Sequence, residues 1–269
     1  MKSFTDKTAV VVGAGHGLGR ALARELAREG CHLALLDRDG EGLRSLQEEL
    51  QAFGRRCSLH EVDIGRREEV LEAARAVAAL HSQVHLLFNC AAVSFTGLFL
   101  EHSLEDFEWV TGVDYLGTVY CCHAFLPLLL RQPEAWVVNV SSGAALQGLP
   151  RRSAYCGAKF AVRGFSEALR LELLDSGVRV CCVFPGPLRT EMYTRSRHAR
   201  PEFRERERRY LERRGWPPEK AARALLRGVR QRRAEIFLGR AVFLGARIRG
   251  CFPGLFRVLL ERFRHRLPV

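Results

Sequence analysis

Residues 8–19 read TAVVVGAGHGLG, a largely β-branched apolar run followed by glycines at positions 13, 15, 17 and 19. The run Thr8–Val12 favours a β-strand, and the segment Arg20–Glu29 behind the glycines has the pattern of a helix. Glycines between a strand and a helix allow a tight turn, a close approach of the backbone to a pyrophosphate, and a helix N-terminus that faces its charge. A plain turn can also require glycine, and the strict Gly-x-Gly-x-x-Gly order is missing. The loop residues predicted to bind a cofactor are Gly13, Gly15, His16, Gly17, Leu18 and Gly19.

The same alternation continues along the chain. Further strands are predicted at His32–Leu36, Cys57–Val62, His85–Phe88, Trp136–Val140, Val178–Phe184 and Glu235–Leu238. Helices are predicted at Leu43–Phe53, Glu68–Leu80, about Leu104–Leu130 and Ala154–Asp175. Strands that alternate with helices of ten or more residues indicate βαβ units. The predicted fold class is therefore α/β, a doubly wound, Rossmann-like parallel sheet that binds ligands at the carboxyl ends of its strands.

The composition suits a soluble globular protein. The chain has 269 residues, 47% hydrophobic and 27% charged, which allows one large domain or two small ones. It holds no run of eighteen apolar residues and no signal-peptide pattern, so a cytoplasmic location is expected. Nine cysteines include two adjacent pairs in apolar stretches, which are expected to be buried, and nine scattered histidines show no ligand spacing, so no metal site is predicted.

The net charge of +12 would suit nucleic acid or an anionic membrane, or simply a solvated basic surface. Of the 42 basic residues only Lys2, Lys7, Lys159 and Lys220 are lysine, and so uniform a use of arginine fits coding bias as well as a ligand. The sequence has no nucleic-acid reader motif and no basic stripe interleaved with aromatic residues. A nucleic-acid partner is therefore not expected.

Two acidic residues stand at predicted strand ends. Asp37 follows the second strand, eighteen residues beyond Gly19, where a carboxylate can accept hydrogen bonds from an adenosine ribose and repels a 2′-phosphate. This position favours NAD, while the adjacent Arg38 leaves NADP open because an arginine can bind that phosphate. Asp63 ends the third strand and could meet the adenine edge.

The residues most typical of chemistry follow the fifth strand. Ser141 and Ser142 come directly after it, and Tyr155 and Lys159 lie four residues apart at the start of the next helix. Residues at this spacing share one face of a helix. Because an ammonium stabilises a phenolate, Lys159 is expected to move the pKa of Tyr155 toward working pH, where the phenol can transfer protons. Ser142 could hold a substrate oxygen from the loop opposite.

With these motifs the chain, from about Thr5 to Gly239, resembles the cytosolic branch of the short-chain dehydrogenase/reductase family. The glycine loop matches the family's Thr-Gly-x-x-x-Gly-x-Gly with Val12 in place of threonine, and the serine thirteen residues before the tyrosine is Ser142. Further matches are the Tyr155 and Lys159 pair, Pro185-Gly186 after the sixth strand, and Thr190. The resemblance implies that these residues line the nicotinamide and contact its carboxamide and phosphates, and that Lys159 also binds the nicotinamide ribose.

The resemblance also implies an activity: an NAD(P)-dependent oxidoreductase that transfers a hydride between the cofactor and an alcohol or carbonyl substrate, with Tyr155 as general acid and base. It implies a homodimer or homotetramer. It does not select a substrate, because one scaffold serves sugars, steroids, retinoids and acyl chains.

Two positions depart from the family. The family's Asn-Asn-Ala-Gly appears as Asn89-Cys90-Ala91-Ala92, where Asn89 and Ala91 match and are assigned to the cofactor site. Asp114 stands where the family usually has an asparagine that kinks a helix and links the lysine to solvent; it stays among the predicted catalytic residues. These departures keep one alternative open, a dinucleotide-binding regulator with little or no turnover.

The predicted organisation is a catalytic domain over residues 1–239, with a substrate lid at about 188–215, and an apolar, basic helical extension over residues 240–269. The arginines of the lid would suit an anionic substrate, and a solvated basic surface is the alternative. An apolar stripe is predicted in the extension at Phe252, Leu255, Phe256, Leu259, Leu260, Phe263 and Leu267. It could lie on an anionic membrane, contact another subunit, or cover the substrate pocket or the core.

Overall fold

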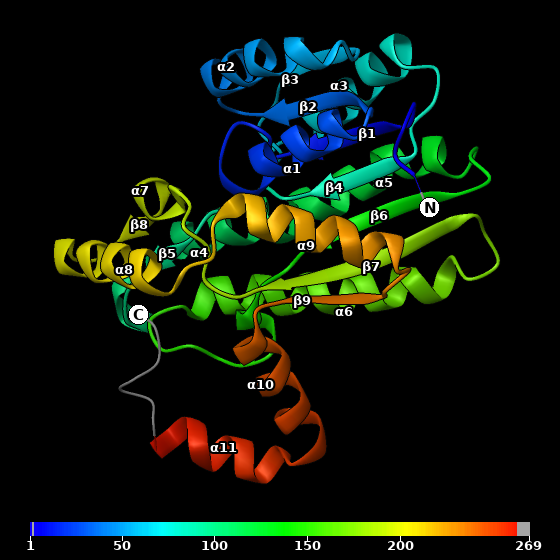
Figure 1. The fold of residues 1–269 in the computed structure, drawn as a ribbon. Coiled ribbons are helices and arrows are strands. Elements are labelled where there is room, and N and C mark those ends of the chain that lie inside the picture. The colour runs from blue at the N-terminus through cyan, green and yellow to red at the C-terminus, as the bar shows by residue number, and fades with distance from the viewer. Residues whose placement is uncertain (2, 263–269) are drawn as a thin grey trace.

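The computed structural model describes residue 1 and residues 3–262, and its centre is a sheet of seven parallel strands (Figure 1). The strands, in the order β3-β2-β1-β4-β6-β7-β9, are Cys57–Glu61, His32–Asp37, Thr8–Val12, Leu86–Asn89, Ala135–Val140, Val178–Pro185 and Glu235–Leu238. The order turns back between β1 and β4, so crossovers leave the sheet in opposite directions there. Ligands bind at such a point in doubly wound folds. The predicted fold class is confirmed.

Helices cover both faces of the sheet. One layer contains α1 (Gly17–Arg28), α2 (Gly40–Leu50) and α9 (Pro218–Arg230). The other contains α3 (Arg67–Leu80), α4 (Leu104–Thr111), α5 (Gly117–Leu129) and α6 (Ser153–Glu172). Each layer packs a separate apolar core against the sheet, because strands covered on both faces present apolar side chains in both directions. The adjacent cysteine pairs at 121–122 and 181–182 are buried, as predicted.

Most elements lie within a few residues of their predicted positions, and two differences concern the site. The helix predicted over Leu104–Leu130 is interrupted by a π-helical turn at Gly112–Leu116, which separates α4 from α5. Such single turns are common at functional sites, and this one carries Asp114. A second sheet of two short strands, β5 (Phe95–Thr96) and β8 (Arg197–His198), was not predicted, since two-residue strands leave no periodic signal.

Two segments flank the carboxyl edge of the sheet. The predicted lid region contains α7 (Met192–Arg195), β8 and α8 (Pro201–Arg214). After β9 the extension forms α10 (Arg240–Cys251), which begins beside the body, and α11 (Pro253–Arg262), which lies farther from the sheet (Figure 1). Phe263 and Leu267 of the predicted stripe lie outside the described residues. Among the helices described, none is long and apolar enough to cross a membrane.

Candidate active site

A cavity of about 500 Å³ opens at the carboxyl ends of the strands, at the point where the strand order turns back. The predicted site residues that line it are Gly13, His16, Gly17, Leu18, Gly19, Asp37, Arg38, Asp63, Ala91, Ser142, Tyr155, Lys159, Pro185, Gly186 and Thr190. Gly15, Asn89 and Asp114 lie outside the lining. The structure therefore brings together most of the residues that sequence reasoning selected from segments far apart in the chain.

The glycine loop packs closely on neighbouring backbone and leads into a helix whose N-terminus is open. Gly13 has φ +80°, and a Cβ there would lie 2.6 Å from the backbone of Ala91. A Cβ on Gly19 would lie 2.0 Å from the carbonyl oxygen of Gly13, so both positions require glycine. No side chain caps the start of α1 and its first turn has no acidic residue, which leaves its N–H groups available to an anion. These features fit a dinucleotide pyrophosphate.

Asp37 fixes this loop as well as facing the cavity. Its Oδ2 accepts a hydrogen bond from the Gly15 N–H at 2.9 Å, and its Oδ1 accepts one from the Asp39 N–H at 3.0 Å. Gly15 thus supports the site from behind instead of lining it. Arg38 is exposed at the rim, while Asp63 accepts from the Gly65 N–H at 2.9 Å.

The lid contacts the same loop. Arg195 of α7 donates to Asp39 Oδ2 at 2.8 Å, and His16 Nε2 lies 2.6 Å from the same oxygen. The backbone N–H of Gly42 and the side chains of Arg195 and His16 hold the pKa of Asp39 well below its ordinary value. Asp39 therefore links Arg195 of the lid to His16 of the cofactor loop at one end of the cavity.

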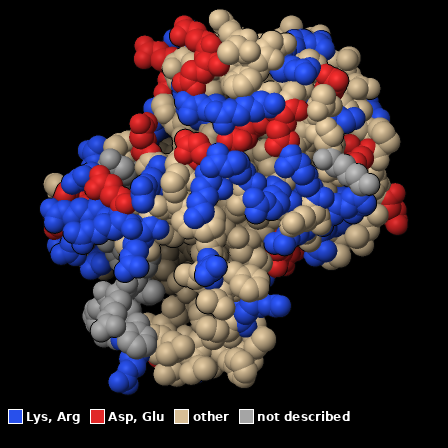
Figure 2. All heavy atoms as spheres, in the orientation of Figure 1, with Lys and Arg blue, Asp and Glu red and all other residues tan. Residues whose placement is uncertain are grey.

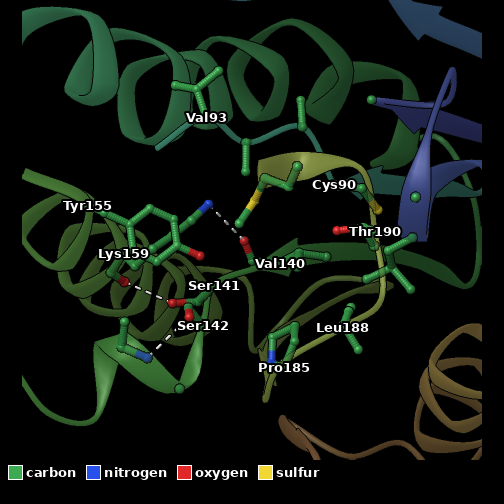
Figure 3. Close-up of a pocket in the computed structure, with 18 of the residues that line it drawn as sticks. Cys90, Val93, Val140, Ser141, Ser142, Tyr155, Lys159, Pro185, Leu188 and Thr190 are labelled. Carbon is green, nitrogen blue, oxygen red and sulfur yellow. Dashed lines mark hydrogen bonds between the residues drawn. The ribbon is translucent and has the colours of Figure 1, made fainter. Parts of the chain in front are cut away.

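Ser142, Tyr155 and Lys159 gather at the other end (Figure 3). Tyr155 and Lys159 come from the first turns of α6, and the Lys159 Nζ lies 5.7 Å from the centre of the Tyr155 ring. Ser142 follows β6, and its Oγ accepts from the Ala144 N–H at 3.1 Å. The Ser141 hydroxyl donates to the Lys159 carbonyl oxygen at 2.8 Å and so ties the β6 loop to α6.

Asp114 lies directly behind this group. Its Oδ1 accepts from the Val93 N–H at 2.7 Å, and its Oδ2 lies 3.2 Å from Lys159 Nζ. Both side chains are buried, with 0% of Asp114 and 1% of Lys159 exposed. Asp114 Oδ2 has no well-aligned hydrogen-bond donor among the described residues. The position that departs from the family therefore places a second charge beside the lysine.

Burial and these charges set the proton affinities. Burial raises the pKa of Asp114, and the Lys159 charge only partly opposes this. Burial is the largest single influence on Lys159 and lowers its pKa, but Asp114, by charge and hydrogen bond, and Tyr155 together outweigh burial, so the pKa of Lys159 is raised. Burial also raises the pKa of Tyr155; Lys159 lowers it and Asp114 raises it further. Lys159 acts in the predicted direction, yet burial is the larger influence and the net shift in the pKa of Tyr155 is upward.

Asn89 serves the sheet instead of the cavity. Its Nδ2 donates to Asn139 Oδ1 at 2.8 Å, and Asn139 Nδ2 donates to the Ser166 hydroxyl at 3.0 Å. This chain of amides connects β4, β6 and α6 inside the protein. Ala91, two residues later, does reach the lining.

Sequence reasoning missed a second buried ion pair at the cavity. Arg152 lies at the start of α6, and its Nη2 is 2.6 Å from Oε1 of Glu207 in α8. Its guanidinium also donates to the Ser94 hydroxyl at 2.5 Å. Glu207 in turn lies 3.0 Å from His198 Nε2. Residues 55 positions apart in the sequence give no local signal of such a contact.

The extension also contributes to the cavity. Its lining residues from α10 are Ala241, Val242, Gly245 and Ala246. They recur one helical turn apart. This spacing of small apolar residues is the sequence feature that could have indicated a helix face packed against the cavity. The predicted stripe in α11 does not cover the core, since most of its described residues are exposed.

Comparisons with known proteins agree with this geometry. The pattern of the family described as short chain dehydrogenase matches residues 7–201. The chain is 38% identical over 257 residues to a putative oxidoreductase, SadH, of Mycobacterium tuberculosis, covering 93% of each protein. It is similar to the crystal structure of a short chain dehydrogenase/reductase from Burkholderia phymatum in complex with NAD, with a TM-score of 0.87, 29% identity and coverage of 95% and 96%.

A short chain dehydrogenase from Burkholderia cenocepacia in complex with NADP is also similar, with a TM-score of 0.80, 26% identity and coverage of 97% and 98%. The sheet order, the glycine loop and the cluster of serine, tyrosine and lysine thus occur together in a chain that matches these three proteins over nearly its full length. The protein belongs to the short-chain dehydrogenase/reductase family.

Proposed function

We propose that the protein is a nicotinamide-dependent oxidoreductase that interconverts an alcohol and a carbonyl compound, with Tyr155 as the proton donor and acceptor. The observation that carries the proposal is the convergence of Ser142, Tyr155 and Lys159 on one end of a cavity whose other end is the glycine loop. A phenol, a hydroxyl and an ammonium in this arrangement can handle a proton next to a bound substrate oxygen.

Each side chain has a separate task. Ser142 orients the substrate oxygen, and Tyr155 gives that oxygen a proton during reduction or removes one during oxidation. Lys159 stabilises the phenolate by its charge, and its ammonium would also bind the nicotinamide ribose hydroxyls. Asp114 keeps Lys159 charged. A bound nicotinamide dinucleotide supplies or accepts the hydride, while the protein contributes position and electrostatics.

The cofactor would lie along the loop from Gly13 to Gly19, with its pyrophosphate at the start of α1. Asp37 at the end of β2 lines this end of the cavity, where it would face the adenosine ribose and favour NAD. The related structures hold NAD in one case and NADP in another, so the choice rests on this chain's own Asp37 and Arg38. We also propose a homodimer or homotetramer, as is common in the family.

A substrate screen tests the proposed activity. Panels of alcohols with NAD or NADP, and of ketones and aldehydes with the reduced cofactors, are followed by nicotinamide absorbance. We expect turnover that depends on cofactor and is faster with NAD(H). A protein that binds the dinucleotide tightly and turns over none of the panel would favour the alternative, a regulator that senses the dinucleotide.

A further inference from the structure

Helix α10 has two different faces. Toward the body, Val242 and Ala246 pack against the small core cluster that contains Leu146 and Phe184, and the same face lines the cavity. The Arg249 guanidinium donates to the Leu146 carbonyl oxygen, which fixes the helix to the loop after β6. This face makes α10 a wall of the active site.

The other face of α10 continues onto α11 as an apolar surface. Side chains that are 36–62% exposed on the two helices are Phe243, Leu244, Ile248, Phe252, Leu255, Val258 and Leu259. We call these seven residues the tail surface. Figure 2 shows this part of the molecule as mostly uncharged atoms with basic groups near its edges, in contrast to the mixed charges over α1 and α9. Exposed large apolar side chains gathered on two neighbouring helices are typical of an interaction site.

The charge around the tail surface indicates what it meets. Residues 240–262 contain five arginines and one glutamate, which gives the segment four net positive charges. In a twofold dimer the same surface would face itself, so these charges would repel each other across the interface. An anionic phospholipid surface offers the complementary charge, and apolar side chains beside arginine are typical of helices that lie at such an interface.

The substrate side of the cavity is suited to an uncharged ligand. The charged side chains there, Arg152 and Glu207, are engaged with each other, and Arg195 at the cofactor-loop end is engaged with Asp39. Other lid arginines also have acidic partners: Arg200 pairs with Glu101, and Arg208 with both Glu205 and Glu212. The lid arginines therefore give little support to an anionic substrate. Between them the cavity presents Val93, Leu149, Leu188, Leu211 and Val242.

We infer that α10 and α11 dock on an anionic membrane surface through the tail surface, and that the cavity takes a lipophilic, uncharged alcohol or ketone that enters from the lipid. The link is α10 itself, since one face lines the cavity and the opposite face would contact the bilayer. The substrate part rests on the proposed oxidoreductase function; the docking part does not.

Vesicle sedimentation tests the docking. The full-length protein is mixed with vesicles of phosphatidylcholine alone or with added phosphatidylserine, at low and high salt. We expect it to sediment with the anionic vesicles at low salt. The double variant Leu244→Glu, Leu255→Glu should bind at least about tenfold more weakly, because each leucine loses apolar burial and each glutamate repels the lipid.

The matched control is Leu171→Glu, Leu174→Glu, which makes the same change at two leucines that are 60% and 66% exposed near the end of α6. It should bind like the parent. Failure of the parent to bind, or equal binding by both double variants, overturns the docking. A parent dimer that only the Leu244→Glu, Leu255→Glu variant breaks, without vesicle binding, would instead assign the tail surface to a second copy of the chain.

Activity with two ketones tests the substrate class. We expect the tail variant to reduce water-soluble cyclohexanone like the parent, and to reduce a long-chain aliphatic ketone dissolved in anionic vesicles at least about tenfold more slowly. A parent that reduces the soluble ketone but not the vesicle ketone overturns the lipophilic substrate. If neither ketone nor any other carbonyl compound is reduced, the proposed function fails, while sedimentation still decides the docking.

Discussion

Helix α6 holds two buried ion pairs on either side of Tyr155, and they are built differently. Arg152 and Glu207, the lid pair, are satisfied by further partners: Ser94 on the arginine, and His198 and Thr96 on the glutamate. Lys159 and Asp114, the site pair, have few further hydrogen-bond partners. One oxygen of Asp114 lacks an aligned donor among the described residues.

The pKa values of the two carboxyl groups, Glu207 and Asp114, are shifted in opposite directions. Burial alone would raise both pKa values. Hydrogen bonds from His198 and Arg152 nevertheless hold the pKa of Glu207 at about 2. At Asp114 burial dominates, and the pKa is raised. A lowered pKa means that ionised Glu207 stabilises the fold, and a raised pKa means that ionised Asp114 costs stability. The lid pair therefore stabilises the fold, whereas in the site pair, beside the reacting group, the cost of ionised Asp114 is opposed by the stabilised ammonium of Lys159.

The largest expected effect comes from the residue between the pairs. Tyr155→Phe removes the ionisable oxygen and keeps the ring, so kcat should fall by roughly 10²–10⁴ if Tyr155 transfers the proton. Steady-state kinetics measure this, and dinucleotide binding by fluorescence should be unchanged. A variant with near-parental turnover would remove Tyr155 from the mechanism.

Breaking the lid pair should cost stability. Glu207→Gln leaves Arg152 charged and buried without its partner, and we expect a loss of about 3 kcal/mol in the free energy of unfolding at neutral pH, measured by urea denaturation. In the parent this contribution should be present above pH 4.5, the ordinary value for glutamate, and decline as the pH falls toward about 2.

Glu205→Gln is the matched control for the lid pair. Glu205 lies on the same helix and pairs with Arg208 and Arg209 at the exposed surface, so its loss should leave the unfolding free energy nearly unchanged. Equal losses from Glu205→Gln and Glu207→Gln would show that the buried network has no special role in holding the lid.

Breaking the site pair should change pH dependence more than rate or stability. Asp114→Asn removes a negative charge that raises the pKa of Tyr155, so the rise of oxidation with pH should move to lower pH. Activity at the new optimum should stay within roughly tenfold of the parent, about 1.4 kcal/mol of barrier. Because Lys159 can lose its proton when it is left without its partner, and Arg152 cannot, the unfolding free energy should fall less than with Glu207→Gln. A large loss of stability with an unmoved pH profile would make the site pair a second structural pair.

The smallest effect is expected at the cofactor end. Asp37→Asn keeps the size of the side chain and removes the charge that repels a 2′-phosphate, so the ratio of kcat/KM for NAD over NADP should fall by about tenfold or less. Measuring both cofactors with one substrate decides it. A parent that already prefers NADP would assign the choice to Arg38.

The parts of the site that could be predicted from sequence are those with a local signature. The glycine loop lies between a strand and a helix, and Tyr155 and Lys159 lie one turn apart on α6. Both features can therefore be predicted from the spacing of residues in the sequence. Asp114 was identified through the family comparison, but its direct contact with Lys159 depends on the π-helical turn at Gly112–Leu116.

The rest depends on contacts between distant segments. Arg152 meets Glu207 only because β5 and β8 bring the lid onto the start of α6, and neither strand is long enough to show a pattern. Asn89 matched a motif, yet its direction within the sheet decides that it binds Asn139 and not the cavity. Sequence could place the extension in a helix, but not show that α10 lines the cavity.

The central claim is that a hydride passes between the nicotinamide and a carbonyl carbon in this cavity, next to Tyr155. The most direct test uses NADH carrying deuterium at the transferable position of the nicotinamide, a carbonyl substrate found in the screen, and mass spectrometry of the alcohol. The account predicts deuterium on the carbinol carbon with the parent and, at equal dinucleotide binding, far less of it with Tyr155→Phe. Tight binding of NADH with no deuterium transferred to any carbonyl compound would contradict it.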